Sequence, residues 1–127
     1  MSKTACPFCD LPESAHVWHS PVSFAIRDRY PVSPGHTLII PRRHAATWLD
    51  ATPAERADLL HAIEVIQRSL DAELHPDGYN VGFNVGEAAG QTVMHLHVHV
   101  IPRFKGDMED PRGGVRHVIP SKGNYLK

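Results

Sequence analysis

The chain has little of several features that mark large protein classes. Its net charge is only -1 at pH 7, so it offers no electrostatic footprint for nucleic acid or for an acidic membrane surface. It has no run approaching the ~18 apolar residues of a membrane span, and its N-terminus lacks the apolar core of a signal peptide. We therefore expect a cytoplasmic globular protein with no nucleic-acid or membrane partner, for which a mononucleotide is still an acceptable ligand.

Cysteine is also scarce, and both copies stand close together as Cys6 and Cys9 in the sequence CPFC. In the cytoplasm such a pair serves metal binding or catalysis more often than a structural disulfide. A C-x-x-C pair is half of a zinc site or a thioredoxin-like redox pair. The redox pair expects a strand before it and a helix after it, but few residues precede Cys6 and Pro12 follows soon, which favours zinc. His44, where a loop leaves a predicted strand, is the natural third ligand.

Histidine, by contrast, is abundant, with 10 copies in 127 residues. His95, His97 and His99 alternate with aliphatic residues inside the stretch 90–103, and a period of two predicts a half-buried strand. The three imidazoles then share one face, while the aliphatic side chains enter the core on the other. We expect Pro102 to end this strand, because proline has no N–H for the sheet ladder.

Three interpretations of this histidine row are open. It is a solvated strand face, although three histidines in strict register disfavour that. It is a metal tripod, because imidazole is the commonest zinc ligand and catalytic zinc often keeps three protein ligands. Or one histidine is a nucleophile and its neighbours bind phosphate. The small-residue loop at residues 84–92 brings polar side chains and free N–H groups to the same face, which suits an anionic ligand.

One long helix and several short strands are expected around this stretch. Thr52, Pro53 and Glu55 form a capping box with proline at the first helical position, which predicts where the helix begins. The apolar stripe ends before Pro76, where the helix should stop. The stripe consists of Leu59, Ile63, Ile66, Leu70 and Leu74, and strands are expected near residues 17–19, 23–28, 36–40, 79–84 and 115–119.

Residues 95–101 match the motif His-φ-His-φ-His-φ-φ, where φ is apolar, and the chain resembles the histidine-triad superfamily. Matches in the same order run from CPFC at residues 6–9 through PGHTLIIPRRH at residues 34–44 to NVGEAAGQTV at residues 84–93. The resemblance is to the bacterial and fragile-histidine-triad-like branches. It implies an α+β fold with an antiparallel sheet and one long helix, and a homodimer with a continuous sheet. It also implies a domain at residues 1–104 and a C-terminal tail at residues 105–127 that packs on the domain.

The same resemblance implies roles for individual residues. His97, the middle histidine, is the implied nucleophile, and His36 and His99 are implied to contact the phosphate. The implied substrate-binding residues are Ile26 and Asp28 around the base and ribose, and Asn84, Gly90, Gln91, Thr92 and Val93 around the phosphate.

A structural zinc ion is implied as well, and no organic cofactor. The activity implied is hydrolysis at the α-phosphorus of dinucleoside polyphosphates or nucleoside phosphoramidates, through a nucleotidyl-histidine intermediate that releases NMP. Two alternatives stay open: a zinc-dependent hydrolase that uses the three triad histidines as a tripod, and a non-catalytic nucleotide-binding protein. The implied ligands of a closed, four-coordinate zinc site are Cys6, Cys9, His44 and His95.

Overall fold

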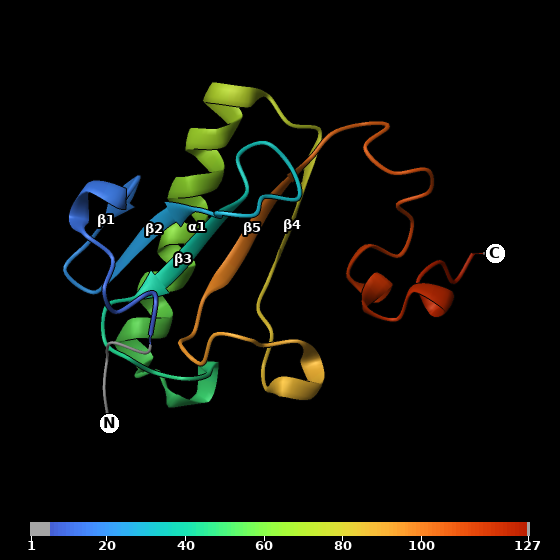
Figure 1. The fold of residues 1–127 in the computed structure, drawn as a ribbon. Coiled ribbons are helices and arrows are strands. Elements are labelled where there is room, and N and C mark those ends of the chain that lie inside the picture. The colour runs from blue at the N-terminus through green and yellow to red at the C-terminus, as the bar shows by residue number, and fades with distance from the viewer. Residues whose placement is uncertain (1–5, 127) are drawn as a thin grey trace.

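The structure, a computed structural model, describes residues 6–126. The first five residues of the predicted domain and the last residue of the predicted tail lie outside this range. A five-stranded sheet has the strand order β1-β2-β3-β5-β4, and one long helix, α1 (Pro53–Leu74), crosses one of its faces (Figure 1). The strands are β1 (Trp18–His19), β2 (Ser23–Arg27), β3 (Thr37–Pro41), β4 (Gly78–Gly82) and β5 (Val98–Arg103), and short 3₁₀ turns span Glu13–Ala15, Trp48–Asp50, Glu87–Ala89, Gly114–Val118 and Pro120–Lys122.

All strand pairs are antiparallel, so the predicted α+β class with an antiparallel sheet and one long helix is confirmed. Nowhere in the described part of the chain does a helix have the length and apolar character needed to span a membrane.

The helix α1 begins where its capping residues predict. The Thr52 hydroxyl accepts a hydrogen bond from the Glu55 amide (3.1 Å), and the Glu55 carboxylate accepts one from the Thr52 amide (2.8 Å). Pro53 occupies the first turn, where its missing N–H would have had no partner in the helix. The helix ends at Leu74, and His75 follows in the left-handed conformation, with φ at 52°. Both predicted ends of the helix are therefore confirmed.

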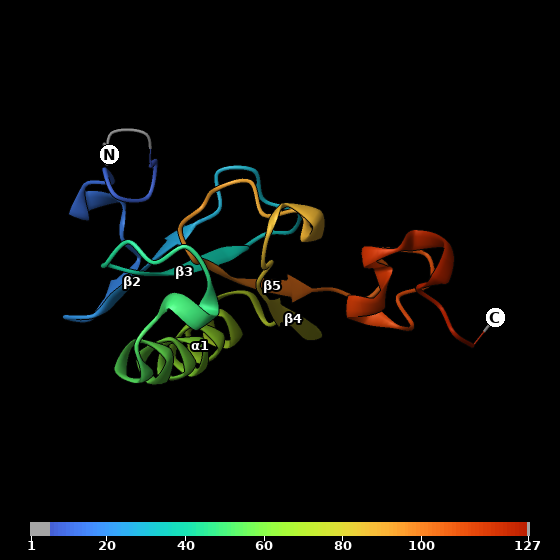
Figure 2. The same ribbon diagram turned by 90° about the horizontal axis from the view of Figure 1, so that it is seen from below.

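Other parts of the chain pack against both faces of the sheet. The helix α1 covers one face, and the N-terminal segment lies on the opposite side of the sheet (Figure 2). On that opposite face, Phe8 and Leu11 pack against the strands but leave part of the surface open as a cavity. The two faces hold separate apolar clusters, with Ala25, Ile39, Leu59, Leu70 and Val100 on the helix side and Phe24, Ile26, Leu38 and Ile40 on the other.

The strand β5 starts later and ends later than predicted. Residues 91–97 are irregular, so of the three alternating histidines only His99 lies in the strand. Pro102 is paired with β4 and does not end the strand. The Arg103 carbonyl accepts a hydrogen bond from the Asp77 amide on the β4 side (2.8 Å), so the nitrogen of Pro102 points the other way. The pairing with β3 has already ended there, and proline therefore removes no ladder bond.

The strand predicted at residues 115–119 is wrong, because this segment forms the 3₁₀ turn Gly114–Val118. Gly113 precedes it in the left-handed region, with φ at 102°, and turns the chain. The Arg116 guanidinium donates to the Gly123 carbonyl (3.1 Å), which folds the tail back on itself. Figure 1 shows the tail beyond the β4 side of the sheet. The division into a domain and a tail packed on it stays a prediction.

Candidate functional site

A cavity of about 870 Å³ opens on the face of the sheet opposite α1, within the usual size range of ligand pockets. Its walls come from the N-terminal segment, β2, β3, the loop between them, and the stretch that leads into β5. Among the lining residues are nine that were predicted to act in catalysis or substrate binding: Ile26, Asp28, His36, Asn84, Gly90, Thr92, Val93, His97 and His99.

The orientation of His97 is set by the main chain. Its Nδ1 lies 2.8 Å from the carbonyl oxygen of His95, which can only accept a hydrogen bond. Nδ1 therefore carries the proton of the neutral ring, and Nε2 keeps a free lone pair. Because His97 lines the cavity, this lone pair is available to a bound substrate.

His36 and His99 are fixed in a different way. The Val32 amide donates to Nδ1 of His36 (3.2 Å), so the proton of neutral His36 is on Nε2. This Nε2 lies 2.9 Å from Nδ1 of His99 and 3.2 Å from Oδ2 of Asp28. Since His36 donates to Nδ1 of His99, the proton of His99 is on Nε2. His99 thus offers the cavity an N–H donor.

Burial keeps both of these imidazoles neutral at pH 7. It lowers the pKa of His99 to about 4, with His97 and His36 as further causes in the same direction. Burial also lowers the pKa of His36, although the Asp28 carboxylate opposes the shift. Neutral rings are what the hydrogen-bond directions between His36 and His99 require.

Cys6, Cys9, His44 and His95 form a second cluster, whose ligand atoms all lie within 4.8 Å of one another. Nδ1 of His95 is 3.3 Å from Sγ of Cys6, and Nδ1 of His44 is 3.2 Å from Sγ of Cys9. Nε2 of His95 donates to the Pro41 carbonyl (2.8 Å), so Nδ1 is left unprotonated and can ligate an ion. The four residues predicted as zinc ligands therefore come together and fit a metal ion.

The three triad histidines do not converge as a metal tripod among residues 6–126. His95 is committed to the cysteines, and His97 is bonded to main chain. Asp28, His36 and His99 also bring ligand atoms within 4.8 Å of one another. Ligation through Nε2 of His36 would move its proton to Nδ1, where the Val32 amide already donates. Hydrogen bonding within this second group therefore accounts for its geometry better than a bound metal ion does.

Comparison with known proteins identifies the family. The sequence description of the HIT domain matches residues 12–106. The chain belongs to the HIT family. It is 36% identical over 104 residues to the asymmetrical bis(5'-nucleosyl)-tetraphosphatase of Schizosaccharomyces pombe, over 81% of this chain and 57% of that protein. It is also 36% identical over 109 residues to the AP-4-A phosphorylase of Mycobacterium tuberculosis, over 81% of this chain and 56% of that protein.

The HIT chain thus spans little more than half the length of these two curated relatives. Among solved structures, a Zn-bound histidine triad family protein from Mycobacterium smegmatis superposes with a TM-score of 0.77 at 35% identity. The match covers 86% of this chain and 82% of that one. The predicted membership of the histidine-triad superfamily is confirmed.

In this HIT domain, the Gln91 side chain points away from the cavity, unlike the other residues predicted to surround the phosphate. Its exposed fraction is 3%, and it is not among the residues that line the cavity. Its Oε1 accepts from the Gly86 amide (2.9 Å), and its Nε2 donates to the carbonyls of Ala46 (2.7 Å) and Val93 (3.1 Å). The side chain therefore fixes the shape of the loop at residues 84–92, which contributes Asn84, Gly90 and Thr92 to the cavity wall. The N–H groups of Ala89, Gly90 and Gln91 donate to carbonyls inside this loop and are not free for an anion, unlike the sequence-based expectation.

Among the lining residues that were not predicted, Phe8 and Val32 contact the histidines of the cavity. Phe8 lines the cavity and contacts His97 edge-to-face, with ring centroids 5.1 Å apart. Its place between Cys6 and Cys9, two predicted metal ligands, was the available signal. The Val32 amide had no signal, because a main-chain donor leaves no trace in the residue type.

Proposed function

We propose that this HIT protein is a nucleotide hydrolase that cleaves at the α-phosphorus of nucleoside derivatives and releases NMP. The observation that carries the proposal is the tautomer of His97, whose Nδ1 proton is held by the His95 carbonyl at 2.8 Å. A neutral imidazole with a fixed tautomer is a competent nucleophile. The proposed substrates are dinucleoside polyphosphates or nucleoside phosphoramidates, and the names of the two nucleotide-cleaving relatives support the former.

The reaction proceeds in two displacements. Nε2 of His97 attacks the α-phosphorus, and a P–N bond forms while the bond to the leaving group breaks and its electron pair departs with that group. Water then attacks the same phosphorus, loses a proton, and displaces His97 as the P–N bond breaks. NMP is released and the imidazole is restored. Dividing one difficult displacement into two easier ones is the general benefit of a covalent intermediate.

The other lining residues bind and orient the nucleotide. His99 donates from Nε2 to a phosphate oxygen, and His36 holds His99 in the tautomer that makes this donation. Ile26 belongs to the apolar cluster on the cavity face of the sheet, here called the outer apolar cluster, and it suits the base. Asp28 suits the ribose. The phosphate end of the cavity is proposed to lie at Asn84, Gly90, Thr92 and Val93.

We assign zinc to the cluster of Cys6, Cys9, His44 and His95, in a structural role. Two thiolates and two imidazoles are the donor set of closed, tetrahedral zinc sites, and the Zn-bound relative supports this choice of metal. The ion would tie the N-terminal loop to the sheet.

The proposed homodimer with a continuous sheet is supported by the position of β4. This strand forms one edge of the sheet, so a second chain can pair along it. Light scattering of the purified protein tests this, and a mass near the 14.1 kDa of one chain would contradict it.

The decisive experiment measures product release from diadenosine tetraphosphate and from an adenosine phosphoramidate. It compares wild type with His97→Ala and with a control, His61→Ala. The control removes an exposed histidine from α1, which lies on the face of the sheet opposite the cavity. Wild type and His61→Ala should release AMP, and His97→Ala should be inactive although folded. Adding inorganic phosphate separates hydrolysis from phosphorolysis, because phosphate as the second nucleophile gives ADP in place of AMP.

Two results would contradict the proposal. AMP release by His97→Ala at the wild-type rate would remove His97 as nucleophile. If neither wild type nor His97→Ala released AMP while both bound it, the chain would be a non-catalytic nucleotide-binding protein.

A further inference from the structure

Phe8 stands in the sequence between Cys6 and Cys9, the two cysteines of the metal cluster, and it also lines the cavity. Both cysteine side chains of the loop at residues 6–9 contact histidines from other parts of the chain. Sγ of Cys6 lies 3.3 Å from Nδ1 of His95, and Sγ of Cys9 lies 3.2 Å from Nδ1 of His44. The Cys9 amide also donates to Sγ of Cys6 (3.3 Å), which closes the loop into a turn. One short turn of chain therefore belongs both to the metal cluster and to the wall of the cavity.

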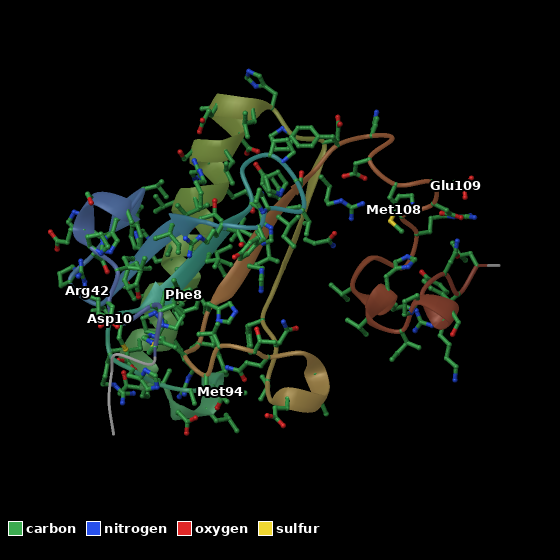
Figure 3. The ribbon with its side chains drawn as sticks, in the orientation of Figure 1. Phe8, Asp10, Arg42, Met94, Met108 and Glu109 are labelled. Atoms are coloured by element: carbon green, nitrogen blue, oxygen red, sulfur yellow. The ribbon has the colours of Figure 1, made fainter. Side chains whose placement is uncertain are left out.

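The ring of Phe8 reaches from this turn to the nucleophile. Its centroid lies 5.1 Å from that of His97 at an interplanar angle of 70°, and 6.0 Å from that of His95 at 78°. Both are edge-to-face contacts, the arrangement that aromatic pairs prefer. Phe8 also packs on the outer apolar cluster, and Figure 3 shows it in front of the sheet near β3. A displacement of the turn would therefore change the surroundings of His97 directly.

His95 is a second link between the two clusters. Its Nδ1 faces the cysteines, while its main-chain carbonyl accepts the hydrogen bond from Nδ1 of His97 at 2.8 Å. The metal ligand and the nucleophile are therefore joined through one residue's side chain and backbone. Phe8 differs from this link because it can be replaced without removing either a ligand or a catalytic group.

We infer that occupation of the metal cluster raises the affinity of the cavity for nucleotides, and that Phe8 carries most of this coupling. The inference rests on the proposed nucleotide site. With the ion bound, the turn is fixed and the Phe8 ring is in place before the nucleotide arrives. Without the ion, the nucleotide must order the turn as it binds, and this loss of entropy weakens binding. Phe8 is thus a positioning residue, and the metal ion contributes to nucleotide affinity through it.

The test measures AMP binding by calorimetry, on protein with one zinc per chain and on chelated protein, for wild type, Phe8→Ala and Phe8→Tyr. In wild type, zinc removal should weaken AMP binding about tenfold, a typical size for coupling between two sites. In Phe8→Ala, zinc removal should weaken AMP binding by only a small part of the factor seen in wild type. Phe8→Tyr, which keeps the ring, should respond to zinc as wild type does.

Equal loss of affinity in wild type and Phe8→Ala would overturn the role of Phe8, and no loss in wild type would overturn the coupling itself. If zinc-loaded wild type did not bind AMP at all, the proposed nucleotide site would be wrong and the inference would fall with it. A coupled zinc site with unimpaired AMP release by His97→Ala would instead overturn the proposed mechanism alone.

A second variant covers the case in which chelated protein unfolds. His44→Ala removes one ligand and keeps Cys6, Cys9 and His95, so its weaker zinc binding can be titrated at partial occupancy, under conditions in which circular dichroism shows the protein to be folded. Coupling is reciprocal, so saturating AMP must tighten zinc binding by the same factor by which zinc tightens AMP binding. A zinc affinity of His44→Ala that is unchanged by AMP would overturn the inference.

Discussion

His97 and His99 stand two residues apart with ring centroids at 5.2 Å, yet they are held in opposite tautomers. The His95 carbonyl keeps the proton of His97 on Nδ1, and the His36 donor keeps the proton of His99 on Nε2. One ring therefore presents a lone pair to the cavity and the other an N–H group. This pairing supports the proposed role of His97 as nucleophile, since negative charge on the phosphate oxygens must be stabilised during attack.

Replacing His36 should therefore reduce activity through His99. In His36→Ala, Nδ1 of His99 loses its donor and the ring is free to adopt the other tautomer, which takes the proton away from the cavity. We expect kcat/KM for the best substrate to fall about a hundredfold, the usual effect of losing one preorganised donor. His36→Gln keeps an N–H group near His99 and should retain more activity than His36→Ala. Equal activity of the two variants would show that the donor to His99 is not what matters.

Stability should depend on pH through His99. Its pKa is lowered from 6.5 to about 4 in the folded protein, chiefly by burial. Between these values the unfolded chain binds a proton that the folded chain does not, so the free energy of unfolding should fall as pH decreases from 6.5 towards 4. The slope from one such group is at most about 1.4 kcal/mol per pH unit. Burial also lowers the pKa of His36, which acts in the same direction.

Urea unfolding at a series of pH values measures this dependence. The matched comparison is His99→Asn, which keeps a polar side chain without a titrating group and should show a shallower fall in the same range. An identical slope in wild type and His99→Asn would contradict the assignment.

Much of the fold was accessible from the sequence, because local rules and the hydrophobic pattern agree there. The capping box at Thr52 predicted the start of α1, and the end of the apolar stripe before Pro76 predicted where the helix stops. The rules failed where tertiary contacts override them. Pro102 remains within β5 because the pairing with β3 has already ended at that position. In the tail, the chain turns at Gly113 and continues as a 3₁₀ turn where a strand was predicted.

The site divides in the same way. Residue type and motif order singled out nine residues that the structure places in the cavity wall and four that it brings together in one cluster, but they could not say which way each side chain faces. Gln91 sits in the predicted loop yet bonds to three main-chain groups. The tautomers of His97 and His99 depend on main-chain atoms, and these become visible only when the chain is folded.

The helix cap offers a test of stability that leaves the site alone. Thr52→Ala removes the acceptor for the Glu55 amide and should lower the free energy of unfolding by about 1 kcal/mol. Chemical denaturation measures this, with Ser69→Ala, an exposed position on the same helix, as control. AMP affinity should be unchanged in both variants, because α1 lies on the face of the sheet opposite the cavity. A loss of affinity in Thr52→Ala would mean that the helix end and the cavity are coupled.

Gln91→Glu separates a structural role for this side chain from a role in binding phosphate. A carboxylate can still accept from the Gly86 amide, but it has no N–H for the carbonyls of Ala46 and Val93. Leaving those partly buried carbonyls without a donor should destabilise the fold by about 1 kcal/mol, and denaturation should detect the loss without any nucleotide present. Thr92→Ala, next along the chain, removes an exposed hydroxyl that lines the cavity and should weaken nucleotide binding at nearly full stability. If Gln91→Glu kept wild-type stability and lost only nucleotide affinity, the glutamine would be a substrate contact and the loop would be held by other bonds.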